Sequence, residues 1–351
     1  MKHRVAIVGA GVSGLTCGLV FAEHGYRTAI FAKEIGQQTT SGAAAALWFP
    51  YDAEPADKVI PWSLGTYRTL IDLARDPDSG VSIIELRQFS RTGEIQIPDW
   101  SILLGARAVD PGLPPVMSSE VENGAAGEAA TWIGRPKAEQ TGSERITSLK
   151  IFKSGFCLRV PLMDTTIYLD YLANRFVAAG GSIAASTQFT QLEDVDSKFD
   201  VVINCAGIGA RELVRDADLE PHRGQIAIVP RIKNLPCAVV CDDVPLMYAI
   251  PRRNDCVLGG TNELSNDLAA DSAMSTRIVA ECTRALKIEK PKVLAERVGL
   301  RPFRKSGVRV QRDQLRDGRI VVHNYGHGGS GFTLSWGCAE EVFELATDSA
   351  D

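Results

Sequence analysis

The chain has 351 residues, of which 45% are hydrophobic and 23% charged, and its formal net charge is −5. This composition is typical of an ordinary globular protein long enough for two domains. The acidic balance excludes a general attraction to nucleic acid or to an anionic membrane surface. No apolar run reaches the length of a membrane span and no signal-peptide stretch opens the sequence, so we expect a cytoplasmic protein.

The eight cysteines are scattered along the chain, without any Cys-x-x-Cys pair. Cys17, Cys205 and Cys338 stand inside apolar runs, where a small hydrophobic side chain is expected. The pattern predicts buried free thiols in a reducing compartment, and it indicates neither disulfides nor a metal site.

The N-terminal residues have the pattern of a dinucleotide-binding unit. An apolar strand is predicted at residues 4–8, and Gly9, Gly11 and Gly14 follow it in the spacing GxGxxG. A helix at 15–24 and a strand at 28–32 complete a βαβ unit, which gives the glycine pattern the context that it needs. Glu34 is expected to bind ribose hydroxyls, and Lys33 either contacts a phosphate or lies in solvent. Val12 and Ser13, at the helix start, belong to the same predicted site.

A hydroxyl cluster follows the second strand. Thr39, Thr40 and Ser41 precede a run of alanines that leads to Leu47. Hydroxyls can donate to a pyrophosphate, and alanines allow the backbone to approach a planar ring. The alternative is a polar turn that leads into a buried helix. A further helix is predicted at residues 62–75.

The middle of the chain has weaker patterns. Residues 82–97 are predicted to form two strands around a turn at 92–93, and residues 111–144 a long surface loop. A helix at 164–179 is expected to begin at the N-cap Asp164. After a short strand at 182–186, a buried strand within 199–207 ends at Gly207 and returns the chain to the first sheet.

The last third begins with an antiparallel section and ends with a glycine-rich turn. Strands are predicted at 223–229, 247–251 and 256–261, with Arg252 and Arg253 in an exposed hairpin turn. A helix at 274–287 and strands at 296–304, 308–311 and 318–323 follow. Four glycines between residues 326 and 331 then precede a helix at 333–347. A flexible backbone at a helix start suits an anionic or electron-accepting ligand.

The order of these motifs resembles that of the D-amino-acid oxidase family. The motifs are the N-terminal glycine unit, residues 39–51, 202–207, 223–225, 248–251 and 299–302, and the closing stretch 323–339. The resemblance implies non-covalent FAD and an α/β fold, in which a Rossmann-like FAD-binding domain is interleaved with an α+β substrate domain on a mixed or antiparallel sheet. We expect residues 1–75, 150–220 and 300–351 in the first domain and 76–149 and 221–299 in the second. The implied reaction oxidises a D-amino acid to an imino acid, with dioxygen as the electron acceptor.

The resemblance also assigns roles to residues. Arg301 matches the arginine that binds the substrate carboxylate, Tyr248 the tyrosine that assists it, and Gly329 the glycine whose carbonyl accepts from the substrate amine. The expected cofactor-binding residues are Gly9, Gly11, Val12, Ser13, Gly14, Lys33, Glu34, Thr39, Thr40, Ser41, Leu47, Gly207, Arg301, Gly328, Gly329, Gly331, Phe332 and Thr333.

The sequence departs from the family pattern at three places. No second tyrosine precedes Tyr248 closely, which puts an active-site lid in question. Ser330 stands where many members have tyrosine, so it is the first position at which we expect altered specificity. Asn262 stands where D-aspartate oxidases commonly have arginine. The expected substrates are therefore neutral D-amino acids.

The residues also suggest a mechanism. Arg301 can hold a carboxylate by two parallel hydrogen bonds. No general base is needed if the α-hydrogen leaves as hydride, and Thr333 and the helix start would then meet the charge that develops on the cofactor. His327 is expected to pack or hydrogen-bond rather than act as a base.

Several alternatives stay open at this point. They are a glycine- or sarcosine-type oxidase, a D-aspartate-type oxidase, a nicotinamide-dependent dehydrogenase and a flavin-binding protein without catalysis. A homodimer is a further open expectation.

Overall fold

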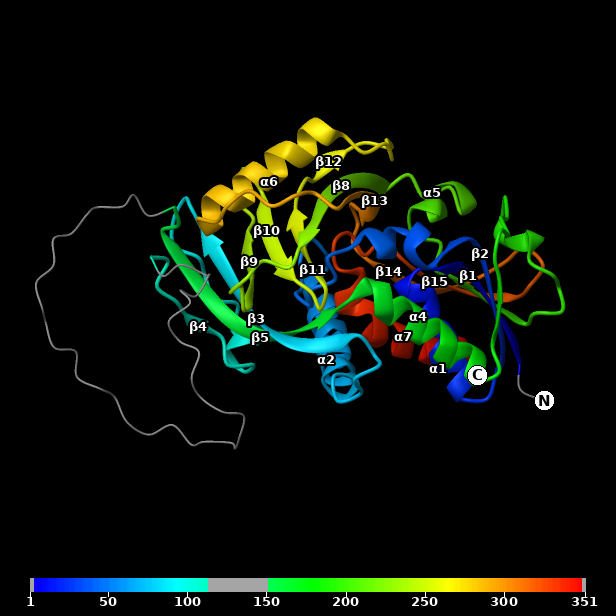
Figure 1. Ribbon diagram of the computed structural model, residues 1–351. Helices are drawn as coiled ribbons and strands as arrows, with labels where there is room; N and C mark the ends of the chain where they lie inside the picture. The colour runs from blue at the N-terminus through cyan, green and yellow to red at the C-terminus, as the bar shows by residue number, and fades with distance from the viewer. Residues whose placement is uncertain (1–2, 113–150, 349–351) are drawn as a thin grey trace, which may run out of the picture.

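A computed structural model describes residues 3–112 and 151–348 of the chain (Figure 1). The surface loop predicted at 111–144 lies, from residue 113 onward, outside the described residues. Two β-sheets organise the rest, and helices pack against each of them.

The first sheet has six strands and contains the predicted βαβ unit. Parallel pairing joins β1 to β2 and β7, β15 to β7, and β2 to β6, whereas β14 is an antiparallel edge strand. In spatial order the strands are β14 (Arg309–Gln314), β15 (Ile320–Tyr325), β7 (Val201–Asn204), β1 (Arg4–Ala10), β2 (Arg27–Ile35) and β6 (Ser182–Ala184). The expected return of the chain to this sheet at β7 is thereby confirmed.

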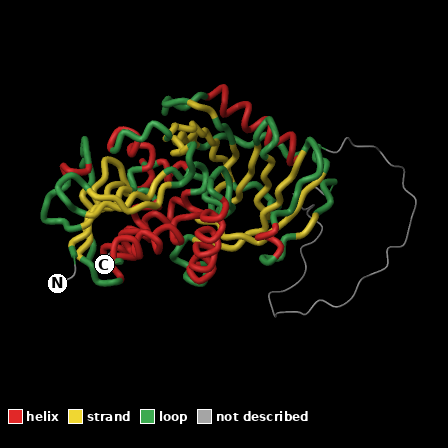
Figure 2. Tube along the Cα trace, turned by 180° about the vertical axis from the view of Figure 1, so that it is seen from behind, coloured by secondary structure: helices red, strands yellow, loops and turns green. Residues whose placement is uncertain are grey.

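Both faces of this sheet are covered, as its apolar strands require. The helices α1 (Val12–Glu23), α4 (Thr165–Ala178) and α7 (Gly331–Thr347) gather on one face (Figure 2). α2 (Ala56–Leu73) packs against α7, and a Cβ at Gly337 would lie 2.2 Å from the Trp62 carbonyl oxygen. A smaller apolar cluster, which includes Phe199, covers the other face.

The second sheet is mixed and has nine strands. β3 runs parallel to β9, and the other pairs are antiparallel. In spatial order the strands are β12 (Glu263–Leu264), β8 (Leu219–Pro230), β11 (Asp255–Gly259), β10 (Met247–Pro251), β9 (Cys237–Cys241), β3 (Val81–Ser90), β5 (Ser154–Met163) and β4 (Arg107–Ala108), while β13 (Ala295–Arg304) pairs with β8. β5 thus lies in this sheet, although it belongs to the segment 150–220 expected in the FAD-binding domain.

The two faces of the second sheet serve different purposes, because successive side chains of a strand point to opposite faces. Val239, Ala249 and Leu258 pack in one cluster with the helix α6 (Ser272–Leu286). Their neighbours Val240 and Ile250 face the other way, toward the first sheet. This alternation creates a walled space between the sheets.

Short helical segments complete the described structure. The α-helical ones are α3 (Asp99–Ile102) and α5 (Ala210–Leu213), and the 3₁₀ turns are η1 (Gly36–Gln38), η2 (Thr40–Ala43), η3 (Leu192–Asp194) and η4 (Gly207–Gly209). η2 contains the hydroxyl cluster of the sequence analysis. The side chain of its N-cap residue, Thr39, accepts a hydrogen bond from the Gly42 amide. The cluster therefore forms a single 3₁₀ turn, and the next α-helix begins only at residue 56.

Two predictions of secondary structure are wrong. Residues 91–97 form no strand, because side chains occupy their backbone groups: the Ile95 amide, for example, donates to Ser154 Oγ at 2.9 Å. The helix α2 begins six residues before the predicted residue 62, since Val59 is a buried member of an apolar cluster with Leu334.

The prediction that Arg252 is exposed is also wrong. Its side chain is buried and not exposed, because Nε and Nη2 donate to the two carboxylate oxygens of Asp255 at 2.7 and 2.8 Å. Nη1 reaches Thr165 Oγ1 at 3.2 Å. Arg253, by contrast, is exposed as predicted.

The burial predicted for the cysteines is confirmed, since all eight are buried free thiols. In the part of the chain that the structure describes, no helix is both long and apolar enough to cross a membrane. Within residues 3–112 and 151–348, no three His, Cys, Asp or Glu side chains form a group that could hold a metal ion.

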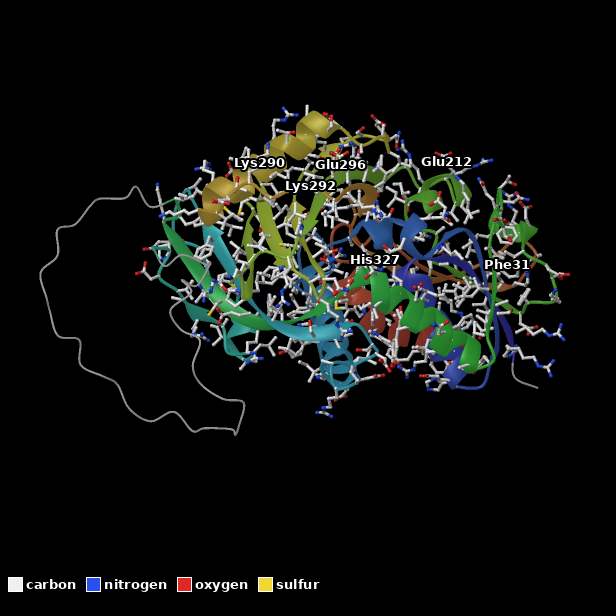
Figure 3. The ribbon with its side chains drawn as sticks, in the orientation of Figure 1. Phe31, Glu212, Lys290, Lys292, Glu296 and His327 are labelled. Atoms are coloured by element: carbon white, nitrogen blue, oxygen red, sulfur yellow. The ribbon has the colours of Figure 1, made fainter. Side chains whose placement is uncertain are left out.

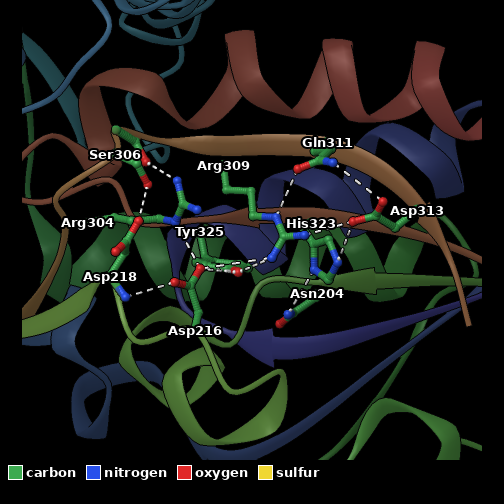
Figure 4. Close-up of polar contacts among 11 residues, drawn as sticks. Asn204, Asp216, Asp218, Arg304, Ser306, Arg309, Gln311, Asp313, His323 and Tyr325 are labelled. Atoms are coloured by element: carbon green, nitrogen blue, oxygen red, sulfur yellow. Dashed lines mark hydrogen bonds and ion pairs between the residues drawn. The ribbon is translucent and has the colours of Figure 1, made fainter.

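A polar network ties the end of β13 to the edge of the first sheet (Figure 4). Asp216, which precedes β8, accepts from Arg304 Nε at 2.9 Å and from the Tyr325 hydroxyl at 2.7 Å. Burial alone would raise the pKa of Asp216, but these hydrogen bonds outweigh it and lower the pKa. His323 lies nearby, and Asn204 Nδ2 is 3.2 Å from His323 Nδ1.

Candidate active site

A cavity of about 1110 Å³ lies where the two sheets face each other. One side is formed by the carboxyl ends of β1, β2 and β7, the edge at which parallel α/β sheets bind ligands. The other side is the inner face of the nine-stranded sheet. The cavity reaches from the six-stranded sheet to the middle of the molecule, as the lining residues Phe31, Glu212 and His327 show (Figure 3).

The three glycines of the N-terminal turn have different roles. Gly9 has a φ of +111°, and a Cβ there would lie 2.3 Å from the Cys205 carbonyl oxygen. A Cβ at Gly14 would lie 2.0 Å from the Gly9 carbonyl oxygen, so Gly14 permits close packing of helix and strand but does not line the cavity. Gly11 lines the cavity, and a Cβ there would lie 3.0 Å from Ser41 Oγ.

The hydroxyl cluster is joined to this turn. Ser41 Oγ accepts from the Val12 amide at 3.0 Å, at the start of α1. Thr39 uses its hydroxyl locally, donating to the Gly36 carbonyl at 2.7 Å, and Thr40 reaches the Leu300 carbonyl at 3.4 Å. All three residues line the cavity, and the Ser41 hydroxyl proton donates to no residue within the described ranges.

The C-terminal glycine turn forms the opposite wall. Gly328 has a φ of +52°, and a Cβ there would lie 2.2 Å from the Asp52 carbonyl oxygen. A Cβ at Gly329 would lie 2.8 Å from Tyr51 Cδ1. The turn thus lies directly against residues 51–52: Gly328 has both a positive φ and a backbone atom in the way, so it must be glycine, while a Cβ at Gly329 would have to displace the Tyr51 ring.

Ser330 and Thr333 hold the neighbouring segment in place. Ser330 Oγ accepts from the Tyr51 amide at 2.8 Å and donates to the Tyr51 carbonyl. Thr333 Oγ1 accepts from the Phe49 amide at 3.1 Å and donates to the Phe49 carbonyl at 3.0 Å. Both hydroxyls are thus engaged with backbone groups, and neither residue lines the cavity.

Arg301 projects from β13 into the cavity. Its Nη1 donates to the Thr261 carbonyl at 2.9 Å and is 3.5 Å from Asn262 Oδ1. The guanidinium lies over Gly224 of β8, where a Cβ would be 2.5 Å from Nη1 and Nη2. Within the described residues, no carboxylate forms an ion pair with Arg301, so its charge is available to an anionic ligand.

Two phenols accompany Arg301. Tyr248 on β10 packs its ring over Gly259, where a Cβ would be 1.9 Å from the ring. Burial raises the pKa of Tyr248, although Arg301 opposes the shift, and burial raises the pKa of Tyr51 to about 12. Both hydroxyls therefore stay protonated at neutral pH and can donate hydrogen bonds.

Two carboxyl groups near this end of the cavity were not among the predicted site residues. Asp242 lines the cavity at the end of β9, and Gln88 Nε2 donates to its Oδ2 at 2.6 Å. Asp52 Oδ2 is buried without a hydrogen-bond partner in the described part of the chain. Burial raises the pKa of each, and for Asp52 the charges of His222 and Arg301 oppose that shift.

Tyr51, Gln88 and Asp242 were missed for different reasons. Tyr51 stands in the predicted 38–51 segment, so its place beside the cavity could have been inferred. Gln88 faces the cavity by strand alternation alone, and Asp242 is the first of two adjacent acids in what the sequence presents as an ordinary turn.

Most of the predicted site residues line this one cavity. They are Gly9, Gly11, Val12, Ser13, Lys33, Glu34, Thr39, Thr40, Ser41, Leu47, Gly207, Tyr248, Arg301, Gly328, Gly329, Gly331 and Phe332, whereas Gly14, Ser330 and Thr333 stand behind its walls. Lys33 and Glu34 form an exposed ion pair of 3.9 Å at the end of β2.

His327 lines the cavity but has a structural partner. Its Nε2 is 2.9 Å from Asn324 Oδ1, and burial lowers its pKa to about 4. The ring is therefore neutral at pH 7, as suits the packing and hydrogen-bonding role expected from the sequence.

The connection between β9 and β10 bears on the question of a lid. It comprises only residues 242–246, and Asp243 accepts from Ser90 Oγ at 2.9 Å and from the Thr92 amide at 3.2 Å. Arg91 Nη1 donates to the Asp243 carbonyl at 3.0 Å. This short connection is fixed to the end of β3, so it has little length with which to cover the cavity.

Comparisons with known proteins identify the family and the fold of the chain. The chain matches the DAO family, described as FAD-dependent oxidoreductases, over residues 4–345. It is 36% identical to a D-amino-acid oxidase of Rubrobacter xylanophilus (98% of this chain, 95% of the relative) and 29% identical to human D-aspartate oxidase (98% and 95%). The crystal structure of glycine oxidase from Geobacillus kaustophilus shares the fold, with a TM-score of 0.76 at 17% identity (100% and 96%).

Proposed function

The chain belongs to the DAO family of FAD-dependent oxidoreductases, and on this basis we propose that it oxidises D-amino acids to imino acids, which water converts to 2-oxo acids and ammonia. The observation that carries the proposal is Arg301, a cavity-lining cation to which no described carboxylate is paired. A guanidinium in that state is suited to the carboxylate of an amino acid.

FAD is the cofactor of this family, and the residues present fit it. The turn at Gly9 and Gly11, the Ser41 hydroxyl and the start of α1 would hold the pyrophosphate, and the Glu34 carboxylate would hold the ribose. Gly328, Gly329 and Gly331 line the same cavity, and the backbone of this turn would be free to approach the flavin ring. Bound FAD would supply the oxidising chemistry, in which the α-hydrogen leaves the substrate as hydride and the electrons go on to dioxygen, giving hydrogen peroxide.

The remaining residues position the amino acid. Arg301 would bind the substrate carboxylate, with the Tyr248 hydroxyl as a second donor. The Gly329 carbonyl would accept from the amine, and Tyr51 closes the same end of the cavity. Two fixed groups on the Cα determine the direction of its hydrogen, so this arrangement selects one enantiomer.

The cavity residues near Arg301 favour orientation over proton abstraction. The raised pKa values of Tyr51 and Tyr248 make these phenols poor bases at neutral pH. His327 is neutral, but its Nε2 is engaged with Asn324. The rate would therefore depend on how well the substrate is aligned.

A substrate panel tests the proposal. The purified protein should show flavin absorbance and release peroxide with D-amino acids, and it should not do so with their L-enantiomers. Glycine, sarcosine and D-aspartate belong in the panel, because each represents an alternative activity. Turnover of glycine or sarcosine alone, or of D-aspartate alone, would refute the proposed substrate class.

A further inference from the structure

The cavity holds an acidic group beyond the residues that the proposed reaction uses. We propose that Asp242 is a specificity-determining residue, which binds the cationic end of a long D-amino acid side chain such as that of lysine, ornithine or arginine. The inference rests on the proposed function, and it replaces the neutral side chains expected from the sequence with a cationic class.

The sheet register places Asp242 beside the substrate position. Gln88 of β3 pairs with Val240 of β9, and Val240 pairs with Tyr248 of β10, so these three side chains share the cavity face. Asp242 follows Val240 by two residues and also lines the cavity. Neighbouring strands are about 4.8 Å apart. A substrate held at Arg301 and Tyr248 therefore has Asp242 on the side of the next strand.

The wall between these groups is apolar. Leu86, Val240, Leu246 and Ile250 line this part of the cavity together with Asp242. An apolar wall that leads to a carboxylate matches a side chain with a methylene stem and a charged head. An acidic side chain would instead be repelled by Asp242.

Asp242 lacks a cation of its own. In residues 3–112 and 151–348 no Lys, Arg or His forms an ion pair with it, and Gln88 is its one side-chain donor there. The residue as a whole is exposed to solvent, but it lines the cavity, and neighbouring protein atoms partly desolvate its carboxyl group. Burial, with Asp243 and Asp52, accordingly raises the pKa of Asp242. A cationic ligand group would relieve this unfavourable environment.

The test compares substrates that share an unbranched apolar stem and differ in the charged group at its end. In the FAD-loaded protein, kcat/KM for D-lysine should exceed that for D-norleucine, and Asp242→Asn should lower the D-lysine value by roughly tenfold or more. The D-norleucine value should change by less than about threefold. Asp243→Asn is the matched control, since it alters the same connection and the same net charge but not a cavity carboxylate.

Binding provides a second measurement, independent of turnover. Calorimetry should show that 6-aminohexanoate binds more tightly than hexanoate, and that Asp242→Asn removes the difference. Because neither compound has an α-amine, this result distinguishes recognition of the side chain from recognition of the α-amino group.

The outcomes separate the inference from the function on which it rests. Equal losses for D-lysine and D-norleucine, or equal binding of the two hexanoates, would overturn the role of Asp242 while D-amino acid oxidation stood. Oxidation of other D-amino acids but of neither D-lysine nor D-norleucine would likewise overturn only the role of Asp242, whereas a FAD-loaded protein that oxidised no D-amino acid of the panel would refute the proposed function, and the inference with it.

Discussion

Replacing Gly224 by alanine should weaken substrate binding while the fold stays intact. The new Cβ would lie 2.5 Å from both terminal nitrogens of Arg301, whereas ordinary contacts begin at 3.4 Å. The guanidinium must then retreat by about 0.9 Å, the difference between these two distances. A displacement of about 1 Å can cost roughly 100-fold in rate, or about 2.7 kcal/mol of transition-state stabilisation.

The assay is kcat/KM for a D-amino acid, measured beside thermal unfolding. Gly224 has no positive φ, and the atoms that it displaces belong to the end of a flexible side chain. The unfolding midpoint should therefore move by no more than about 2 °C. Gly93→Ala is the control, because a Cβ there meets nothing within 4 Å.

A double variant tests whether Gly224→Ala acts through Arg301. Gly224→Ala acts through Arg301, so adding it to Arg301→Ala should cost little beyond Arg301→Ala alone. A kcat/KM of Gly224→Ala within about threefold of the parent value, in a folded protein, would refute the reasoning.

Four further outcomes are expected. Arg301→Lys keeps the charge but loses the planar two-point contact, so kcat/KM should fall roughly tenfold to hundredfold with flavin absorbance unchanged; a fall below threefold would contradict the assignment. Asp216→Asn breaks a buried ion pair and should lower the free energy of unfolding in urea by about 3 kcal/mol, whereas no loss would show the network to be dispensable. Burial lowers the pKa of His323 from 6.5 to about 4, so its contribution is complete above pH 6.5 and declines as the pH falls toward 4; unfolding at pH 7 and pH 5 should differ more in the parent than in His323→Asn. Burial and the charges of Asp243 and Asp52 raise the pKa of Asp242, although the hydrogen bond from Gln88 opposes the shift, so the preference for D-lysine over D-norleucine should grow as the pH rises through that pKa; a preference constant with pH would contradict the role of Asp242.

The sequence was sufficient for the elements whose signals are local. The strand, glycine turn and helix at residues 4–24 follow from apolar runs and from glycines that tight packing requires, and the structure has them in the same order. The C-terminal turn and the helix after it were also predicted from local signals, although α7 begins at Gly331, two residues earlier than predicted.

Features that depend on distant partners could not be predicted. Arg252 looked like a turn residue, because its contacts with Thr165 and Asp164 join segments almost ninety positions apart. Residues 91–97 have strand-forming composition, but Asp243 and Ser154 occupy the backbone groups that a strand would have used. In both cases tertiary contacts overrode the local pattern.

The site shows the same division. Arg301, Tyr248 and the glycines were found through motifs, whereas Gln88 and Asp242 face the cavity because of strand register. The hydroxyls of Ser330 and Thr333 were expected at the ligand, yet they bind the 49–51 backbone. From the sequence alone, one cannot tell whether a hydroxyl in a motif hydrogen-bonds to a ligand or to the backbone of the chain itself.

The alternation along β9 and β10 has a consequence for how this protein can change. Val239 and Ala249 are committed to the contact with α6, while Val240 and Ile250 line the cavity and pack at the edge of the apolar cluster between the sheets. Substitutions at Val240 and Ile250 can reshape substrate preference while the cluster around α6 keeps its packing. Selection, whether natural or in the laboratory, thus has positions at which one face of the sheet changes and the other stays as it is.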